Sequence, residues 1–163
     1  MTLIAIDGPA GTGKTTLAGE FFKNFSQNKS VVVIHMDDLY DGWDNALGDA
    51  LTSTLAHIVH AHNTKSQFSI SIYNWATHSF DSTQVIQPCD ILIIEGVGAG
   101  QKVVRDAGAT LYWLDIEPDV GLARVLQRDG LHIQSQMRQW CLDQETHFAR
   151  DATRMHADHI ITS

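Results

Sequence analysis

The chain has 163 residues, of which 44% are hydrophobic and 18% are charged, so we expect one domain, residues 1–163, with a hydrophobic core. Its formal net charge of −8 and the lack of a basic block argue against nucleic acid as the main partner. No apolar run approaches the length of a membrane span and no signal peptide precedes the first expected strand, so we expect a cytoplasmic protein that binds no membrane.

Apolar segments that are typical of buried parallel strands alternate with helical patterns along the chain. The expected strands cover residues 3–6, 31–35, 91–95, 110–115 and 159–162, and an extra short strand outside the main sheet is expected at 69–73. The expected helices cover residues 15–24, 44–62, 101–106, 119–128 and 135–153. This alternation predicts an α/β fold in three layers, with a five-stranded, parallel, doubly wound sheet and helices on both faces.

The first expected strand leads into Gly8-Pro9-Ala10-Gly11-Thr12-Gly13-Lys14-Thr15, which fills every fixed position of the phosphate-loop pattern G-x-x-x-x-G-K-[ST]. Its glycines let backbone N–H groups turn toward a phosphate, and the helix that follows adds partial positive charge. Lys14 can reach the β- and γ-phosphates, and the Thr15 hydroxyl can ligate Mg²⁺. The motif predicts a P-loop NTPase fold that binds ATP and Mg²⁺ through Gly8, Ala10, Gly11, Thr12, Gly13, Lys14, Thr15 and Thr16.

Two adjacent carboxylates follow the second expected strand, in His35-Met36-Asp37-Asp38-Leu39-Tyr40. Ligands bind at the carboxyl ends of parallel strands, and adjacent carboxylates there are unfavourable unless a cation or a substrate hydroxyl lies nearby. One of the two could accept a proton from an attacking hydroxyl and orient that hydroxyl toward the γ-phosphate. Aspartates after a strand also form Asx turns and helix caps, so the pattern leaves both interpretations open.

The third expected strand ends in an acid, in Ile91-Leu92-Ile93-Ile94-Glu95-Gly96. A carboxylate in this position would hold Mg²⁺ directly or through a water, although Glu95 could also only cap the strand. The next residues, Gly96-Val97-Gly98-Ala99-Gly100, do not complete the dinucleotide pattern G-x-G-x-x-G because Gln101 stands at its last glycine. We expect instead a mobile glycine loop beside the phosphates.

Two arginines, Arg124 and Arg128, stand four residues apart on one expected helix. Like charges at this spacing repel each other slightly, which favours a shared anionic target, but a solvated helix face is the competing interpretation. Trp43, Trp75 and Trp140 are expected to pack in the core or to line the cleft.

Several segments resemble the uridine kinase-like enzymes, which include uridine–cytidine and nicotinamide riboside kinases. Asp37-Asp38-Leu39-Tyr40 resembles their D-[SD]-F-[YF] element, and Tyr73-Asn74-Trp75-Ala76-Thr77-His78-Ser79 is similar to their Y-D-F-x-x-H-S stretch, with Asn74 in place of the aspartate. Ile94-Glu95-Gly96 is similar to their strand-end E-G. With the phosphate loop and the terminal Ala157-Asp158-His159-Ile160-Ile161, the similarity spans nearly the whole chain in the same order.

The resemblance implies that Asp37 accepts the proton of a sugar 5′-hydroxyl and that Thr15, Glu95 and Asp37 surround Mg²⁺. It implies that Tyr73 and His78 lie against a nucleobase, with Tyr40 and Asp44 as further substrate contacts. Arg124 and Arg128 would belong to the approach and hinge of a lid, around residues 128–136, that closes over ATP. In this short lid, Leu131-His132-Ile133 stands where the family has additional arginines.

The sequence therefore predicts a kinase that transfers the γ-phosphoryl group of ATP to a small-molecule hydroxyl, the 5′-hydroxyl of a nucleoside according to the resemblance. Lys14, Asp37, Arg124 and Arg128 are its predicted catalytic residues. Two alternatives remain, an ATP-hydrolysing accessory protein without an acceptor and a nucleoside monophosphate kinase. The oligomeric state is left open, with a homodimer as one option.

Overall fold

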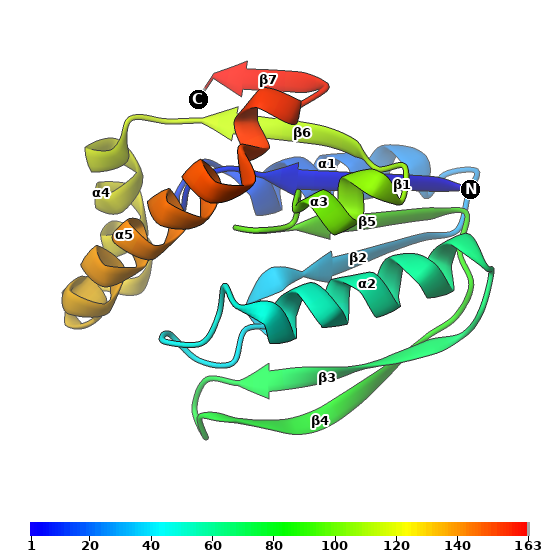
Figure 1. Ribbon diagram of the computed structural model, residues 1–163, viewed down its shortest axis with the longest axis horizontal. Helices are drawn as coiled ribbons and strands as arrows, with labels where there is room; N and C mark the ends of the chain where they lie inside the picture. Colours follow the sequence, from blue (N-terminus) through cyan, green and yellow to red (C-terminus); the bar gives the residue numbers. More distant parts are fainter. Residues whose placement is uncertain (163) are drawn as a thin grey trace.

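The computed structural model describes residues 1–162 and confirms the expected parallel sheet. Five strands lie in the order β2-β5-β1-β6-β7, and every neighbouring pair is parallel (Figure 1). The carboxyl ends of β1, β5 and β2 therefore lie side by side at one edge of the sheet. These strands are β1 (Thr2–Asp7), β2 (Val31–His35), β5 (Ile91–Glu95), β6 (Thr110–Asp115) and β7 (His159–Thr162).

Helices cover both faces of this sheet, as the alternation of strands and helices predicted. α1 packs on one face through a cluster that includes Ile4, Ile93 and Ala18, and the larger core cluster fills the other face beneath α2 and α3. The helices are α1 (Lys14–Phe25), α2 (Asp49–Asn63), α3 (Lys102–Asp106), α4 (Pro118–Asp129) and α5 (Gln134–Asp151), with short 3₁₀ helices η1 (Met36–Asp38), η2 (Leu131–Ile133) and η3 (Thr153–His156). Within residues 1–162, no helix is both long and apolar enough to cross a membrane.

The expected helix over residues 44–62 begins five residues later, because Gly48 is extended (ψ −171°) and precedes the first helical residue, Asp49. The apolar residues at 46 and 47 continue the helical pattern in the sequence, but the chain around them forms turns. They pack against the core from a loop, which a pattern of apolar residues cannot distinguish from a helix.

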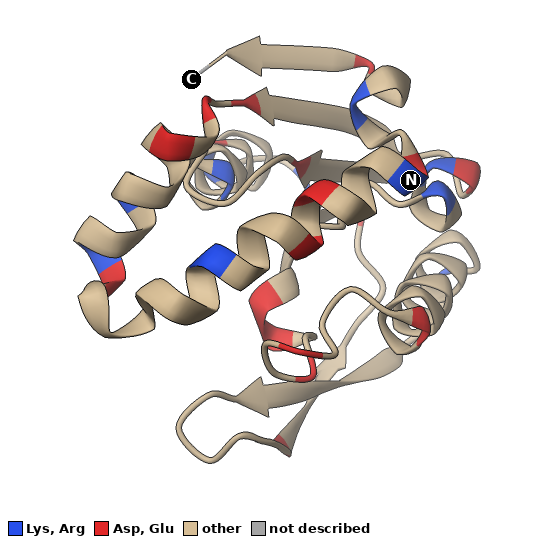
Figure 2. Ribbon diagram, turned by 60° about the vertical axis from the view of Figure 1, so that its left-hand side comes forward, with Lys and Arg blue, Asp and Glu red and all other residues tan. Residues whose placement is uncertain are grey.

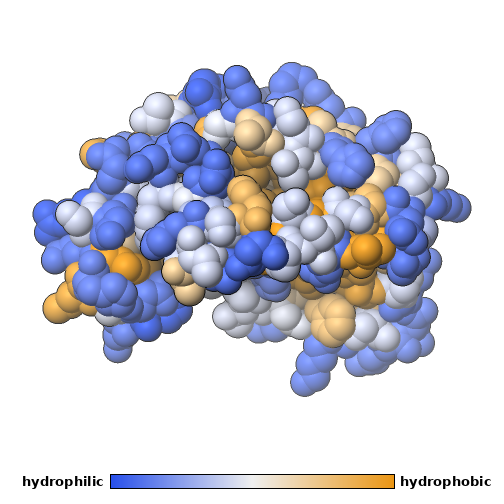
Figure 3. All heavy atoms as spheres, turned by 90° about the horizontal axis from the view of Figure 1, so that it is seen from below, coloured by the Kyte–Doolittle hydropathy of each residue, from blue (hydrophilic) through white to orange (hydrophobic). Residues whose placement is uncertain are grey.

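The extra strand expected at 69–73 is part of an antiparallel hairpin, β3 (Phe68–Asn74) and β4 (Ser79–Ile86), which lies beyond α2 (Figure 1). β4 has no counterpart among the expected strands. Seven of its eight residues are exposed, so its sequence carries no clear alternation of apolar and polar residues. Figure 3 views the molecule from below, the side on which the hairpin lies in Figure 1, and shows exposed apolar side chains between polar ones. The exposed apolar residues of β4 are Phe80 and Val85.

Candidate active site

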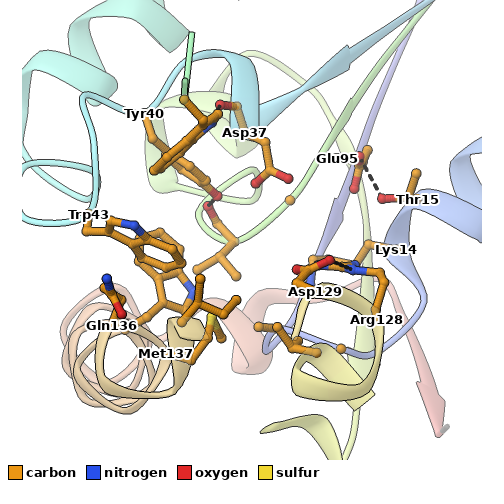
Figure 4. Close-up of a pocket in the computed structure, with 18 of the residues that line it drawn as sticks. Lys14, Thr15, Asp37, Tyr40, Trp43, Glu95, Arg128, Asp129, Gln136 and Met137 are labelled. Atoms are coloured by element: carbon orange, nitrogen blue, oxygen red, sulfur yellow. Dashed lines mark hydrogen bonds and ion pairs between the residues drawn. The ribbon is translucent and has the colours of Figure 1, made fainter. Parts of the chain in front are cut away.

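A cavity of about 620 Å³ opens where the carboxyl ends of β1, β2 and β5 meet (Figure 4). The phosphate loop and the start of α1 form one side, and η1 with the chain that follows it forms the other. Residues of α4, η2 and α5 close the cavity from above the sheet edge. Of the residues predicted from the sequence, the cavity is lined by Ala10, Gly11, Gly13, Lys14, Thr15, Thr16, Asp37, Tyr40, His78, Glu95 and Arg128.

The phosphate loop ends in a buried lysine at the first residue of α1. Lys14 Nζ donates hydrogen bonds to the Pro9 carbonyl at 2.7 Å and to Thr12 Oγ1 at 3.4 Å. Burial lowers the pKa of Lys14 to about 8, although the carboxylates of Asp7, Glu95 and Asp37 act in the opposite direction. Gly11 and Gly13 have φ of 83° and 91°, which glycine adopts without strain, so the loop can curl around this ammonium group.

Close contact between α4 and the phosphate loop fixes the position of that loop. A Cβ added at Gly121 in α4 would lie 2.6 Å from the Ala10 carbonyl oxygen, and one added at Gly11 would lie 2.4 Å from the Gly121 carbonyl oxygen. Backbone therefore packs directly on backbone here, with no room for a side chain on either partner.

We expect Gly121→Ala to shift the phosphate loop, destabilise the fold by about 1–3 kcal/mol and weaken nucleotide binding, because the backbone must move apart to admit the methyl group. Urea unfolding and titration with a non-hydrolysable ATP analogue measure both effects. Gly19→Ala in α1 is the matched control, since nothing lies within 4 Å of its added Cβ and it should stabilise the helix by about 0.5–1 kcal/mol. Unchanged nucleotide affinity in Gly121→Ala would contradict this packing argument.

Glu95, at the end of β5, faces the start of α1. Its Oε1 atom accepts a hydrogen bond from Thr15 Oγ1 at 3.1 Å and lies 2.5 Å from His35 Nδ1, the residue paired with it in the β2–β5 register. This contact raises the pKa of His35. Among residues 1–162 no group of three or more His, Cys, Asp or Glu could hold a metal ion. A hydroxyl and a carboxylate beside a phosphate loop nevertheless fit Mg²⁺, which takes few protein ligands and completes its shell with phosphates and water.

Asp37 stands in η1, and its carboxylate points into the cavity on the side toward Glu95 (Figure 4). The surrounding protein desolvates this carboxylate and the charge of Glu95 repels it, so the pKa of Asp37 lies above its ordinary value. Trp75 Nε1 donates a hydrogen bond to the Asp37 carbonyl at 3.0 Å, which ties η1 to the end of the hairpin. Asp38 also has a raised pKa but does not line the cavity.

The two arginines lie in different places. Arg128 lines the cavity, where its guanidinium forms two hydrogen bonds with Asp129, at 2.7 and 2.6 Å, which raise the pKa of Arg128. Arg124, one turn earlier, donates to the Gly11 carbonyl at 3.4 Å, outside the cavity lining. In the residues the structure describes, the cationic Lys14 and Arg128 lie together on the phosphate-loop side of the cavity (Figure 4).

Aromatic side chains form the side of the cavity opposite the phosphate loop. Tyr40, Trp43, Trp75 and Trp140 line it, with ring centroids 5.1 Å apart for Tyr40 and Trp140 and 5.4 Å apart for Trp43 and Trp75. We call these four residues the aromatic wall. His78 lines the cavity beside them, in a turn with φ of 54°. The three tryptophans, for which the sequence left core and cleft open, thus face the cleft.

Four other predicted residues lie outside the cavity lining. Tyr73 is only 6% exposed and packs beneath Trp75 and Phe80. Asp44 lines a second hollow with Asp41, Asp49 and Asp143, where Figure 2 shows acidic segments gathered in the loop between β2 and α2. Thr12 is buried in the loop beside Lys14, and Gly8 packs against the Leu114 backbone.

The sequence interpretation missed several residues that surround the site. Asp129, Gln136 and Met137 line the cavity from α4 and α5, and a helical pattern alone does not tell which turn of a helix meets a cleft. Asp7, the last residue of β1, is completely buried next to the phosphate loop. Its carboxylate accepts hydrogen bonds from the backbone amides of Gly8, Gly98 and Gly100. The glycine loop at residues 96–100, expected from the sequence to be mobile, is therefore fixed by hydrogen bonds. The sequence did offer one indication of this role, because Asp7 is a charged residue at the end of an otherwise apolar strand.

Burial raises the pKa of Asp7 from 3.8 to about 6, although its amide donors and Lys14 act in the opposite direction. The folded chain thus binds this proton more tightly than the unfolded chain, so the contribution of Asp7 to stability falls as pH rises between these values and is constant above them. At about 1.4 kcal/mol per pKa unit, the unfolding free energy of the wild type relative to Asp7→Asn should fall by about 3 kcal/mol from about pH 4 to about pH 7. Urea unfolding at several pH values measures this difference, and a difference that does not vary with pH would contradict it.

Known proteins are similar to this chain in sequence and in architecture. The model of the phosphoribulokinase / uridine kinase family matches residues 40–149. A uridine kinase of Lactobacillus johnsonii is 24% identical over 179 residues, which cover 98% of this chain and 85% of that protein. A uridine kinase of Staphylococcus aureus is 29% identical over 143 residues, which cover 78% of this chain and 68% of that protein. The solved structure of a protein from Bacillus stearothermophilus, described as a possible uridine kinase, has the same fold with a TM-score of 0.69 and 21% identity, and the match covers 98% of this chain and 88% of that one.

Proposed function

Because the chain belongs to the phosphoribulokinase / uridine kinase family, whose uridine kinase-like members are P-loop kinases, we propose that it transfers the γ-phosphoryl group of ATP to the 5′-hydroxyl of a nucleoside. One observation carries this proposal: a single cavity joins a phosphate loop with its lysine to an aspartate and an aromatic wall on the opposite side. That arrangement separates a place for a triphosphate from a place for a planar acceptor.

The triphosphate end of the cavity would be held by the backbone N–H groups of the phosphate loop, by Lys14 and by Arg128. Thr15 and Glu95 would hold Mg²⁺, which when bound supplies positive charge to the β- and γ-phosphates. Lys14 and Arg128 neutralise charge that develops on the transferring group, and their positions are set before the reaction by burial and by the pairing with Asp129. The protein contributes mainly positioning and electrostatic stabilisation to this reaction.

Asp37 would accept the proton of the acceptor hydroxyl while the hydroxyl oxygen forms a bond to the γ-phosphorus. The bond between that phosphorus and the β–γ bridging oxygen breaks, and ADP leaves with the electron pair. The raised pKa of Asp37 suits a base, since a more basic carboxylate holds the proton more firmly, and its place in the cavity aims it at the phosphate side. Residues of the short lid, His132, Ile133 and Gln136, line the same cavity and would limit the access of water.

The aromatic wall favours a nucleoside as the acceptor, because a planar base can stack on or pack edge-on against tryptophan and tyrosine rings. The cavity-lining cations of residues 1–162 lie on the phosphate-loop side, which favours an uncharged acceptor over a nucleoside monophosphate, whose phosphate would need arginines of its own.

ADP formation by the purified protein with ATP and Mg²⁺ tests this function. The assay is run without acceptor, with a panel of nucleosides and with the matching nucleoside monophosphates. We expect stimulation by at least one nucleoside, with the product identified by mass spectrometry as its 5′-monophosphate. Acceptor-independent hydrolysis would favour an accessory ATPase, and stimulation by monophosphates alone would favour a nucleoside monophosphate kinase; either result rejects the proposal.

A further inference from the structure

Asp7 is a charged residue that the proposed reaction does not use, yet it is completely buried at the carboxyl end of β1. Its Oδ1 atom accepts hydrogen bonds from Gly8 N at 2.7 Å and Gly98 N at 3.0 Å, and Oδ2 accepts one from Gly100 N at 2.8 Å. One carboxylate thus joins the first residue of the phosphate loop to the loop after β5. An apolar residue in its place would leave three backbone amides buried without a partner.

The loop that Asp7 holds, residues 96–100, is buried throughout and forms part of the cavity through Gly96 and Val97. Its packing is tight: a Cβ added at Gly100 would lie 2.6 Å from Leu111 Cδ1 and 3.2 Å from Asp7 Oδ2. The path of this loop is therefore set by hydrogen bonds to Asp7 at Gly98 and Gly100 and by close packing at Gly100. We expect a change in these hydrogen bonds to displace the loop.

The loop in turn holds the aromatic wall. Tyr40 is only 2% exposed. Its hydroxyl donates a hydrogen bond to the Val97 carbonyl at 2.6 Å, and its ring packs on Trp140. Figure 4 shows Tyr40 on the same side of the cavity as Trp43, away from Lys14. A continuous chain of contacts thus leads from Asp7 through Gly98, Gly100 and Val97 to the acceptor side.

We propose that Asp7 is a positioning residue for the acceptor, which fixes the glycine loop 96–100 against the phosphate loop and thereby places Val97 and Tyr40. This inference rests on the proposed function. It assigns to Asp7 a larger effect on the acceptor than on the nucleotide, because the one hydrogen bond that joins Asp7 to the phosphate loop comes from Gly8, outside the cavity lining. The charge of Asp7 also raises the pKa of Lys14, so nucleotide binding is compared at a pH where Lys14 is largely protonated. The remainder of the phosphate loop is held by α4 at Gly11 and Gly121.

Asp7→Asn at pH 7 tests the proposal, because at this pH Asp7 is largely ionised and Lys14, whose pKa is about 8, is largely protonated in the wild type. The amide can keep Oδ1 as the acceptor for Gly8 and Gly98, but its NH₂ group then faces the N–H of Gly100, so one bond to the loop is replaced by a contact between two donors. We expect the KM for the acceptor nucleoside to rise about tenfold and kcat to fall about tenfold, with the Kd for a non-hydrolysable ATP analogue within about threefold of wild type. A merely structural loss of folded protein would lower kcat without changing either KM or Kd.

Asp90→Asn is the matched control, because Asp90 also anchors backbone at a strand end, through Ser30 N at 2.8 Å, but at the amino end of β5. Its kinetic constants should equal those of the wild type. Unchanged KM in Asp7→Asn, or a loss of nucleotide affinity as large as the loss of acceptor affinity, would overturn the proposal. A wild-type protein that phosphorylates no nucleoside would reject the proposed function instead.

Amide hydrogen exchange of the wild type tests the anchor even where Asp7→Asn does not fold. We expect the N–H groups of Gly98 and Gly100 to exchange as slowly as that of Gly96, which is bonded to the β1 carbonyl of Ile6. Exchange of Gly98 and Gly100 at the rate of an exposed loop amide would show that the carboxylate does not hold them, and would overturn the proposal.

Discussion

Lys14→Ala is expected to reduce phosphoryl transfer at least about a thousandfold and to weaken ATP binding about 10- to 100-fold. Lys14 is the buried cation at the start of α1, and its ammonium group lies among carbonyl and hydroxyl oxygens of the phosphate loop, 2.7 Å from the Pro9 oxygen. A triphosphate in this loop would exchange those neutral acceptors for charged ones, which form stronger hydrogen bonds. The alanine variant loses this interaction in the bound complex and in the transition state.

Titration calorimetry with a non-hydrolysable ATP analogue and a coupled assay of ADP formation measure the two effects of Lys14→Ala. Thermal unfolding should show no loss of stability, because burial already disfavours the charged ammonium group, as its lowered pKa indicates. Lys23→Ala, at an exposed position in the last turn of the same helix, is the matched control and should leave both constants unchanged. ATP affinity equal to that of the wild type in Lys14→Ala would contradict the position assigned to the triphosphate.

Asp37→Asn is expected to reduce transfer about 10²- to 10⁴-fold while leaving ATP binding within about threefold of wild type. The amide has nearly the shape of the carboxylate but cannot accept the hydroxyl proton. Since the base acts only when it is deprotonated, the wild-type rate should also fall as pH decreases through the raised pKa of Asp37. This separation of chemistry from binding is what distinguishes Asp37 from Lys14.

The neighbouring carboxylate provides the control for Asp37. Asp38 belongs to the same 3₁₀ helix and also has a raised pKa, but it does not line the cavity, so Asp38→Asn should transfer the phosphoryl group at nearly the wild-type rate. Steady-state kinetics with the nucleoside acceptor, together with binding of the ATP analogue, compares the two variants. Substantial activity in Asp37→Asn, or equal losses in both variants, would reject Asp37 as the base.

Much of the fold follows from local sequence patterns. The expected strands at 31–35, 91–95, 110–115 and 159–162 have the observed bounds. Each of the first three contains four consecutive apolar residues, which is typical of buried strands. The strand at 159–162 has only two, Ile160 and Ile161, and is exposed along its whole length. The hairpin was only half predicted, since a strand that is exposed on nearly its whole length is defined by its partner rather than by its own composition. The beginning of α2 was also misplaced, because Gly48 is extended where the pattern of apolar residues continues.

The candidate site was likewise predicted in part from the sequence. Lys14, Thr15, Asp37 and Glu95 were found from the sequence because each follows directly from a motif or from the end of a strand. The inward position of Trp75 could not be found in this way. A register irregularity between Ile72 and Tyr73 breaks the alternation of side chains along β3. Tyr73, which the family resemblance predicted to contact a nucleobase, therefore packs beneath Trp75 of the aromatic wall instead of lining the cavity.

The sequence by itself determined that a phosphate loop follows a buried strand and that acids stand at or just after the ends of two expected strands, since these features depend only on residues close together in the chain. Only the tertiary structure decided which side chains share the cavity. It placed Arg128 in the cavity and Arg124 behind the phosphate loop, and it buried Asp7 against amides more than ninety residues away. The physical reason is that the direction of a side chain relative to a distant element is fixed by packing and hydrogen bonds between segments, which no local pattern records.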